Sequence, residues 1–237
     1  MTVLICPVRP GETNEELRHA LRSWETNMIL PDLELWTVGF KPSWLDPDRH
    51  ISGNFYKSPH LAVFDNVRLG AEEAVNAHEE NIIYMNDDFF CLDPIGAVLP
   101  VRRNITLEQH IAQFPGNPSL WWPRSLRLTA SWLAGEGFPH PDSYEVHRPL
   151  LCDALGMMEA LHRWHDQQGG LLGDMVPQWR TIYGVLNKVD AHPVGDAKLG
   201  RRQTGVGTPW VSTSDESWRL YARSIKPRFQ KPSRWEK

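Results

Sequence analysis

Residues 82–90 read IIYMNDDFF, and this stretch decides the fold that we expect for the chain. The apolar run 82–85 is typical of a buried strand, and it continues directly into Asn86, Asp87 and Asp88. Two adjacent carboxylates at a strand end repel each other unless a positive charge lies beside them. Oxygen ligands in this arrangement suit a hard divalent cation such as Mg²⁺ or Mn²⁺. The plainer alternative is that one Asp caps a turn and the other faces solvent.

The chain before this strand alternates between strand patterns and helix patterns. We expect strands over residues 2–6 and 35–40, a helix that Thr13 opens, and a second helix over residues 66–78. Glu16 completes a capping box with Thr13, and Leu17, Leu21 and Trp24 then follow at helical spacing. This order indicates an α/β fold with a largely parallel sheet and right-handed crossovers. Ligands of such sheets bind outside the carboxyl ends of the strands, which is where the acidic pair lies.

The second half of the chain is less regular. Residues 100–145 carry much Pro, Gly and Trp, so we expect a lobe or long loops there. Residues 149–164 have the apolar spacing of a helix, and residues 181–187 suggest another helical piece. The tail 224–237 is basic and Pro-rich, and we expect it to be extended or mobile.

Composition narrows the class of protein. The 237 residues suit one domain, with 41% hydrophobic and 23% charged residues, as in ordinary globular proteins. The net charge of −4 argues against a general electrostatic attraction for nucleic acid, although a local basic patch is compatible with it. Eleven Trp are compatible either with an ordinary core or with a groove that has aromatic walls.

The chain has no features that indicate export or membrane insertion. Three widely spaced cysteines without metal-binding spacing suggest free thiols in a reducing compartment. No apolar run approaches the ~18 residues that span a bilayer. The opening MTVLICPVRPG is typical of a first strand rather than a signal peptide, so we expect a cytoplasmic protein.

Other candidate site residues are identified by their position relative to the expected strands. Arg9 comes directly after the first strand, where a guanidinium can bind phosphate. Asn66 and Arg68 lie between the second and third strands and could contact a donor, although helix capping explains Asn66 equally well.

Two further candidates lie in the second half. His147 immediately precedes the helix expected over 149–164, where helix amides favour anions, so it could bind metal or diphosphate or shuttle a proton. Asp215, in the turn STSDES, could activate an acceptor hydroxyl or cap a helix that begins near residue 216.

Several of these motifs together resemble the Stealth proteins, which are sugar-phosphate transferases of capsule synthesis. NEELRHALRSW (14–24), the Pro-x-Trp-Leu of KPSWL (41–45), YMNDDFF (84–90) and His147 occur in the family's order. The core is also similar to the GT-A fold of nucleotide-sugar glycosyltransferases, in which an Asp-x-Asp motif occupies the same strand end. The Trp-Val-Asp-Gly region that opens Stealth proteins is absent, which favours the ordinary glycosyltransferase over the phosphotransferase.

The resemblance implies a GT-A-like domain over residues 1–237, with a nucleotide-sugar-binding half (1–98) and an acceptor-side half (99–237). It implies a metal-dependent glycosyltransferase in which Asp88 binds Mn²⁺ or Mg²⁺ and Asp87 and Asn86 arrange metal, water and ribose. Arg9 and Arg180 would bind the diphosphate of a nucleotide-sugar donor, although a surface position is almost as good an explanation for Arg180.

The acceptor-side roles and the acceptor itself stay open. The catalytic residues would be Asp87 together with His147 or Asp215, of which His147 or Asp215 would act on the acceptor. The acceptor is a glycan, a protein or a nucleic acid base. Two alternatives remain: transfer of a hexose 1-phosphate, and a non-catalytic carbohydrate-binding protein that uses the Trp-rich middle and needs no metal.

Overall fold

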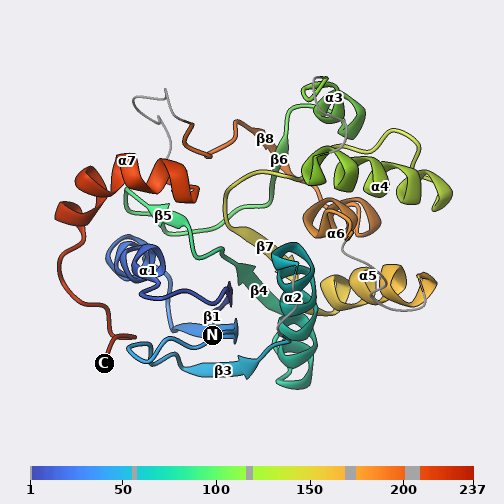
Figure 1. The fold of residues 1–237 in the computed structure, drawn as a ribbon. Helices are drawn as coiled ribbons and strands as arrows, with labels where there is room; N and C mark the ends of the chain where they lie inside the picture. Colours follow the sequence, from blue (N-terminus) through green and yellow to red (C-terminus); the bar gives the residue numbers. More distant parts are fainter. Residues whose placement is uncertain (1, 55–57, 116–119, 169–174, 201–208) are drawn as a thin grey trace.

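Strands and helices alternate through the first half of the chain. The computed structural model describes residues 2–54, 58–115, 120–168, 175–200 and 209–237 (Figure 1). The strands are β1 (Thr2–Val8), β2 (Leu33–Gly39), β3 (Arg49–Ser52), β4 (Asn81–Tyr84), β5 (Phe89–Cys91), β6 (Val101–Arg103), β7 (Leu150–Asp153), β8 (His192–Val194) and β9 (Trp210–Ser212). The helices are α1 (Glu15–Asn27), α2 (Pro59–Asn76), α3 (Leu107–Ala112), α4 (Trp121–Gly135), α5 (Ala154–Gln167), α6 (Trp179–Leu186), α7 (Asp215–Ile225) and the short 3₁₀ helix η1 (Lys226–Arg228).

The central sheet has five strands in the order β3-β2-β1-β4-β7. The first four strands are parallel, and β7 pairs with β4 in the antiparallel direction. The expected mixed α/β fold, with a mostly parallel sheet flanked by helices, is therefore confirmed. β1 and β4 are neighbours, so the residues that follow them emerge at the same edge of the sheet.

Alternate residues of β1 serve two separate cores. Leu4 and Cys6 pack with α1 on one face, whereas Val3 and Ile5 pack with α2 and α5 on the other. Figure 1 shows α1 on one side of the sheet and α2 with α5 on the opposite side. The sheet is therefore the middle of three layers.

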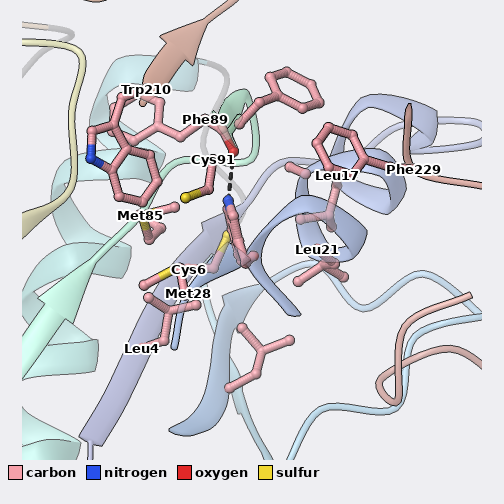
Figure 2. Packing of buried hydrophobic residues seen from close by; sticks show 14 of the residues in the cluster. Leu4, Cys6, Leu17, Leu21, Met28, Met85, Phe89, Cys91, Trp210 and Phe229 are labelled. Atoms are coloured by element: carbon pink, nitrogen blue, oxygen red, sulfur yellow. Dashed lines mark hydrogen bonds between the residues drawn. The ribbon is translucent and has the colours of Figure 1, made fainter. Parts of the chain in front are cut away.

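Helix α1 anchors the first core. Figure 2 shows Leu17 and Leu21 of α1 packed near Phe229 from the end of the chain and near Phe89 from β5. The buried Trp24 indole donates its N–H to the carbonyl of Phe89 at 2.6 Å. The helical face predicted from the apolar spacing is thus the face that is buried.

The start of α1 differs from the prediction. Thr13 does not cap the helix: the N-cap is Asn14, in a left-handed conformation and without a side-chain cap bond. Asn14 instead donates its amide to the carbonyl of Arg9 at 3.1 Å, and Glu16 turns towards Arg9 and Thr213. Contacts with the loop after β1 therefore override the local capping box.

Helix α2 begins seven residues earlier than predicted. Ser58 is its N-cap and Pro59 occupies the first turn, which is a favourable start for a helix. Asp65 and Asn66 consequently lie inside the helix and are buried, so neither is a cap.

The prediction of a helix over residues 149–164 is wrong for its first turn. Leu150–Asp153 form β7, whose backbone completes the sheet beside β4, and α5 starts only after Asp153 caps it through the N–H of Gly156 at 2.5 Å. His147 therefore precedes a strand, and the argument that helix amides surround it fails.

The second half contains its own small core. Helices α3, α4 and α6 pack around Leu107, Leu126, Leu133 and Tyr144. The segment expected to be a lobe or long loops is thus largely helical where it is described.

The C-terminal tail is packed rather than mobile. Trp235 is 1% exposed, and Glu236 accepts two hydrogen bonds from Arg22, both at 2.7 Å. Arg18 lies 3.4 Å from the same carboxylate. Arg18 and Arg22 therefore hold the tail against α1.

Candidate functional site

A cavity of about 870 Å³ lies at the carboxyl ends of β1 and β4. Its walls include the starts of α2, α4, α6 and α7 and the segment before β7. Predicted site residues that line it are Arg9, Asn66, Asn86, Asp87, Asp88, His147, Arg180 and Asp215. Residues scattered over more than 200 positions of the sequence are thus brought to one place.

The acidic pair follows the last sheet contact of β4. Met85 still donates its N–H to the carbonyl of Ile5 at 2.9 Å, so Asn86 is the first residue beyond the sheet. A turn follows, closed by the N–H of Phe89 and the carbonyl of Asn86 at 3.2 Å. This turn carries Asp87 and Asp88 to the cavity wall.

Arg9 neutralises Asp87. Its Nε lies 3.3 Å from Asp87 Oδ2, and its Nη2 donates to Asp215 at 2.8 Å and lies 3.5 Å from Glu16. The charge of Asp87 is the largest contribution that raises the pKa of Arg9, and burial opposes it. Arg9 stays charged while its half-exposed guanidinium faces the cavity.

Lys198 neutralises Asp88. Its ammonium donates to Asp88 Oδ2 at 2.7 Å, to Ser212 Oγ at 3.2 Å and to the carbonyl of Thr213. Ser212 also donates to Asp88 Oδ2, at 2.8 Å. The second carboxylate oxygen, Oδ1, is buried and has no hydrogen-bond partner among the described residues. A buried acceptor without a partner is costly, so this oxygen has an unused capacity to accept a hydrogen bond or a cation.

Burial and mutual repulsion change the acidity of this group of carboxylates. Burial, opposed by Arg9 and reinforced by Asp88, raises the pKa of Asp87 to about 6. Burial also raises the pKa of Glu16 to about 7, although the hydrogen bond from Thr213 and the charge of Arg9 lower it. Because burial is the largest cause of both shifts, an entering cation would favour the charged forms of these carboxylates.

His147 is held by a carboxylate that sequence reasoning missed. Asp196 Oδ1 lies 2.8 Å from His147 Nδ1 and accepts the His147 backbone N–H at 3.0 Å. Burial would raise the pKa of Asp196, but the bonds from His147 and the charge of Arg103 lower it below its usual range. The contact fixes the imidazole through Nδ1 and leaves Nε2 as the nitrogen that can exchange a proton.

Arg180 lies buried in the cavity wall rather than on the surface. Its guanidinium carbon lies 4.7 Å from the Trp179 ring centroid, and Nη1 donates to the carbonyl of Arg148 at 2.8 Å. Burial lowers its pKa, and the charge of Glu145 opposes that effect. Nη2 has no hydrogen-bond partner among the described residues. An unsatisfied donor on a buried cation is suited to an anion.

Asn66 reaches the cavity from inside α2. A side chain on Gly39, whose φ is +104°, would place a Cβ 2.6 Å from Asn66 Nδ2, and one on Gly53 would collide with Oδ1. These two glycines allow the amide to lie against the ends of β2 and β3. Asn66 Oδ1 is buried without a hydrogen-bond partner in the described chain.

Arg68 is not brought to the cavity. Its guanidinium donates to Asp65 at 2.7 Å and also contacts Glu72, so it links two turns of its own helix. Arg68 is absent from the residues that line the cavity.

Aromatic residues form another part of the wall. Trp121, Trp122 and Trp179 all line the cavity. His60 stacks on Trp121 with ring centroids 3.4 Å apart and planes 10° apart. Part of the Trp-rich middle is therefore beside the charged residues.

The carboxylates of Asp87 and Asp88 suit a divalent cation whose remaining ligands come from a bound substrate. Within the described ranges, no group of three or more His, Cys, Asp or Glu could hold a metal ion by itself. Asp87 and Asp88 supply carboxylates, and the buried Asp88 Oδ1 lacks a partner. Mg²⁺ characteristically binds one or two carboxylates plus substrate phosphates and water. The residues therefore fit such an ion in company with phosphates.

Some residues of the site gave no signal in the sequence. Lys198 and Asp196 lie in the polar stretch GDAKLG, and Glu145 lies ahead of His147 in YEVH. The sequence predicts Glu16 only as a capping residue, whereas in the structure it contacts Arg9 and Thr213 beside the acidic pair. A carboxylate in the NEELR motif, one turn from the loop after β1, was the available signal.

Comparison with known proteins adds no family assignment: no family model and no curated protein matches the chain. Fold and cavity together define an α/β protein with a charged cavity at the carboxyl edge of its sheet. The Stealth and GT-A resemblances stay predictions.

None of the helices in the described part of the chain has the length and apolar character that crossing a bilayer requires.

Proposed function

We propose that this protein is a glycosyltransferase that uses a nucleotide-sugar donor together with Mg²⁺ or Mn²⁺. One observation carries the proposal: two carboxylates, two cavity-lining arginines and an oriented histidine converge on one cavity at the carboxyl edge of a parallel sheet. A cavity of about 870 Å³ accommodates a nucleotide sugar and part of an acceptor.

The donor side would be bound by charge. Arg9 and the unsatisfied Nη2 of Arg180 would hold the diphosphate, and the amide of Asn66 would hydrogen-bond the nucleoside. Asp88, with Asp87 and Asn86 beside it, would hold the divalent cation. That cation would supply neutralisation of the charge on the leaving diphosphate.

The acceptor side would use His147. His147 Nε2 takes the proton of the acceptor hydroxyl. At the same time the hydroxyl oxygen forms a bond to the anomeric carbon of the sugar. The bond between that carbon and the diphosphate oxygen breaks, and the nucleoside diphosphate leaves. Asp196 holds the imidazole in place through Nδ1. Asp215 is ion-paired with Arg9, so we assign it to positioning Arg9 rather than to proton transfer.

A thermal-shift screen of nucleotide sugars, with Mn²⁺ and with a chelator, tests the proposal. We expect one donor to raise the melting temperature only with Mn²⁺, and Asp88→Asn to abolish that shift while the fold persists. Asp46→Asn, a half-exposed aspartate away from the cavity lining, is the matched control. No shift with any nucleotide sugar would refute the proposal.

Product analysis separates the alternatives. Released nucleoside diphosphate indicates glycosyl transfer, whereas nucleoside monophosphate indicates hexose-1-phosphate transfer. Stabilisation by a free sugar that persists in chelator, with no turnover of donor, would indicate a carbohydrate-binding protein instead.

A further inference from the structure

Lys198 places a positive charge directly beside Asp88. Its ammonium contacts three oxygens: Asp88 Oδ2 at 2.7 Å, Ser212 Oγ at 3.2 Å and the Thr213 carbonyl. Three acceptors saturate the three N–H donors of an ammonium group. The contact is therefore a built site for one positive charge.

The backbone around Lys198 keeps the side chain in place. The N–H of Ser212 donates to the carbonyl of Ala197 at 2.9 Å, and the N–H of Leu199 donates to the carbonyl of Ser212 at 2.8 Å. These two bonds form a parallel bridge between Lys198 and Ser212 at the end of β9. The lysine is therefore fixed in register with the residue that shares Asp88 with it.

Charge makes the ammonium and a divalent cation exclude each other. Lys198 engages Asp88 through Oδ2, and a metal ion bound to Oδ1 would lie within a few ångströms of the ammonium. Around the pair, the described carboxylates are Glu16, Asp87, Asp88 and Asp215, and the described cations are Arg9, Lys198 and Arg180, whose charge also interacts with Asp88. Removal of the Lys198 charge would increase the attraction of this group for a cation.

We propose that Lys198 is a tethered counter-ion that competes with the divalent cation for Asp88. The inference rests on the proposed function for the identity of the cation site, and it adds how that site is regulated. Without substrate, Lys198 neutralises Asp88 and keeps the affinity for free metal low. A donor diphosphate offers the ammonium another anion, so the metal binds together with the donor rather than before it.

Calorimetric titration of Mn²⁺ alone tests the competition. We expect Lys198→Gln, which keeps a polar side chain of similar length but removes the charge, to bind Mn²⁺ about tenfold or more tightly than the parent. Lys198→Arg, which keeps the charge, should stay near the parent. Lys226→Gln is the matched control, because Lys226 is similarly half-buried and pairs with Glu15 outside the cavity lining.

The outcomes are decisive for Lys198. Equal or weaker Mn²⁺ affinity in Lys198→Gln, or no Mn²⁺ binding by either protein, overturns the inference. If Lys198→Gln does not fold, as judged by circular dichroism, Lys198→Met provides the second uncharged variant. If nucleotide sugars fail to bind but Lys198→Gln still tightens Mn²⁺ binding, the proposed function fails and the competition stands.

Discussion

Replacement of Arg9 by Ala is the sharpest test of how the cavity binds a donor. In the structure the guanidinium bridges Asp87 at 3.3 Å and Asp215 at 2.8 Å, and its half-exposed side chain lines the cavity. We expect Arg9→Ala to weaken binding of a nucleoside diphosphate and to leave binding of the bare nucleoside unchanged. The reason is that only the diphosphate has charged oxygens for Arg9.

The magnitude follows from the contacts. A charge-assisted hydrogen bond contributes about 1.5–3 kcal/mol, which corresponds to an increase in Kd of about 10- to 150-fold. Arg9 already has carboxylate partners, so part of its interaction with phosphate replaces existing ion pairs. We therefore expect the lower half of that range.

A second consequence concerns Asp87. Arg9 lowers the pKa of Asp87, which burial has raised to about 6, so loss of Arg9 must raise that pKa further. A larger fraction of Asp87 is then protonated near neutral pH, and Mn²⁺-dependent binding should suffer more at pH 6 than at pH 8. The parent should show a smaller difference between the two pH values.

Isothermal titration calorimetry measures these quantities directly. The parent, Arg9→Ala and Arg163→Ala are titrated with a nucleoside diphosphate and with the nucleoside. Arg163 is the matched control, because it is also half-exposed and ion-paired but lies outside the cavity lining. Equal losses for both ligands in Arg9→Ala would show that Arg9 only supports the structure, and the reasoning would be refuted.

Further predictions concern proton transfer, pH and the tail. His147→Ala should keep donor binding within about twofold and lower turnover by roughly 10²–10⁴-fold, measured by calorimetry and product release; weakened donor binding would make His147 a donor ligand instead. Burial raises the pKa of Glu16 to about 7, so the folded state binds the proton more tightly than the unfolded state and stability falls as pH rises from about 4.5 to 7. Glu16→Gln should therefore gain stability relative to the parent across that window in urea denaturation, and a pH-independent difference would contradict it. Glu236→Gln should cost about 2 kcal/mol of unfolding free energy because Arg22 loses its carboxylate partner, whereas Asp46→Asn, in an exposed pair, should cost under about 1 kcal/mol.

Strands with continuous apolar runs were predictable from the sequence. β1, β2 and β4 lie between turn-forming residues and are buried on both faces, so local composition and final environment agree. β7 was not predictable, because Leu151 and Leu155 also fit helical spacing. Its strand conformation comes from the ladder with β4, which pairs residues about 70 positions apart.

The start of α2 was missed for a different reason. Ser58 and Pro59 form a good capping signal, but the apolar spacing that we followed begins later in the helix. The extra two turns carry His60 and Ala62 to the cavity wall. An error of seven residues at a helix end thus concealed part of the site.

Some residues of the site were predictable from local sequence and others were not. Asp87, Asp88 and Arg9 follow directly after strands, so their place at the sheet edge is a consequence of local sequence. Lys198 lies 110 residues from its partner Asp88, and Asp196 lies 49 residues from His147. Such partners have no local pattern, because only the packing of the second half against the sheet brings them together.

Asp87 and Asp88 already have positively charged partners, so a metal ion would have to displace one of them in order to bind. The adjacent carboxylates at the end of β4 predict a neighbouring positive charge, and Arg9 and Lys198 supply it from the protein itself. Under the proposal, a metal ion at Asp88 would therefore exchange with a resident ammonium rather than enter an uncompensated acidic site. Asp196 and Lys198 are two residues apart, so the segment that neutralises Asp88 also orients His147. An exchange of cations at Asp88 would thus act on the segment that orients His147, which links the donor side of the cavity to the acceptor side.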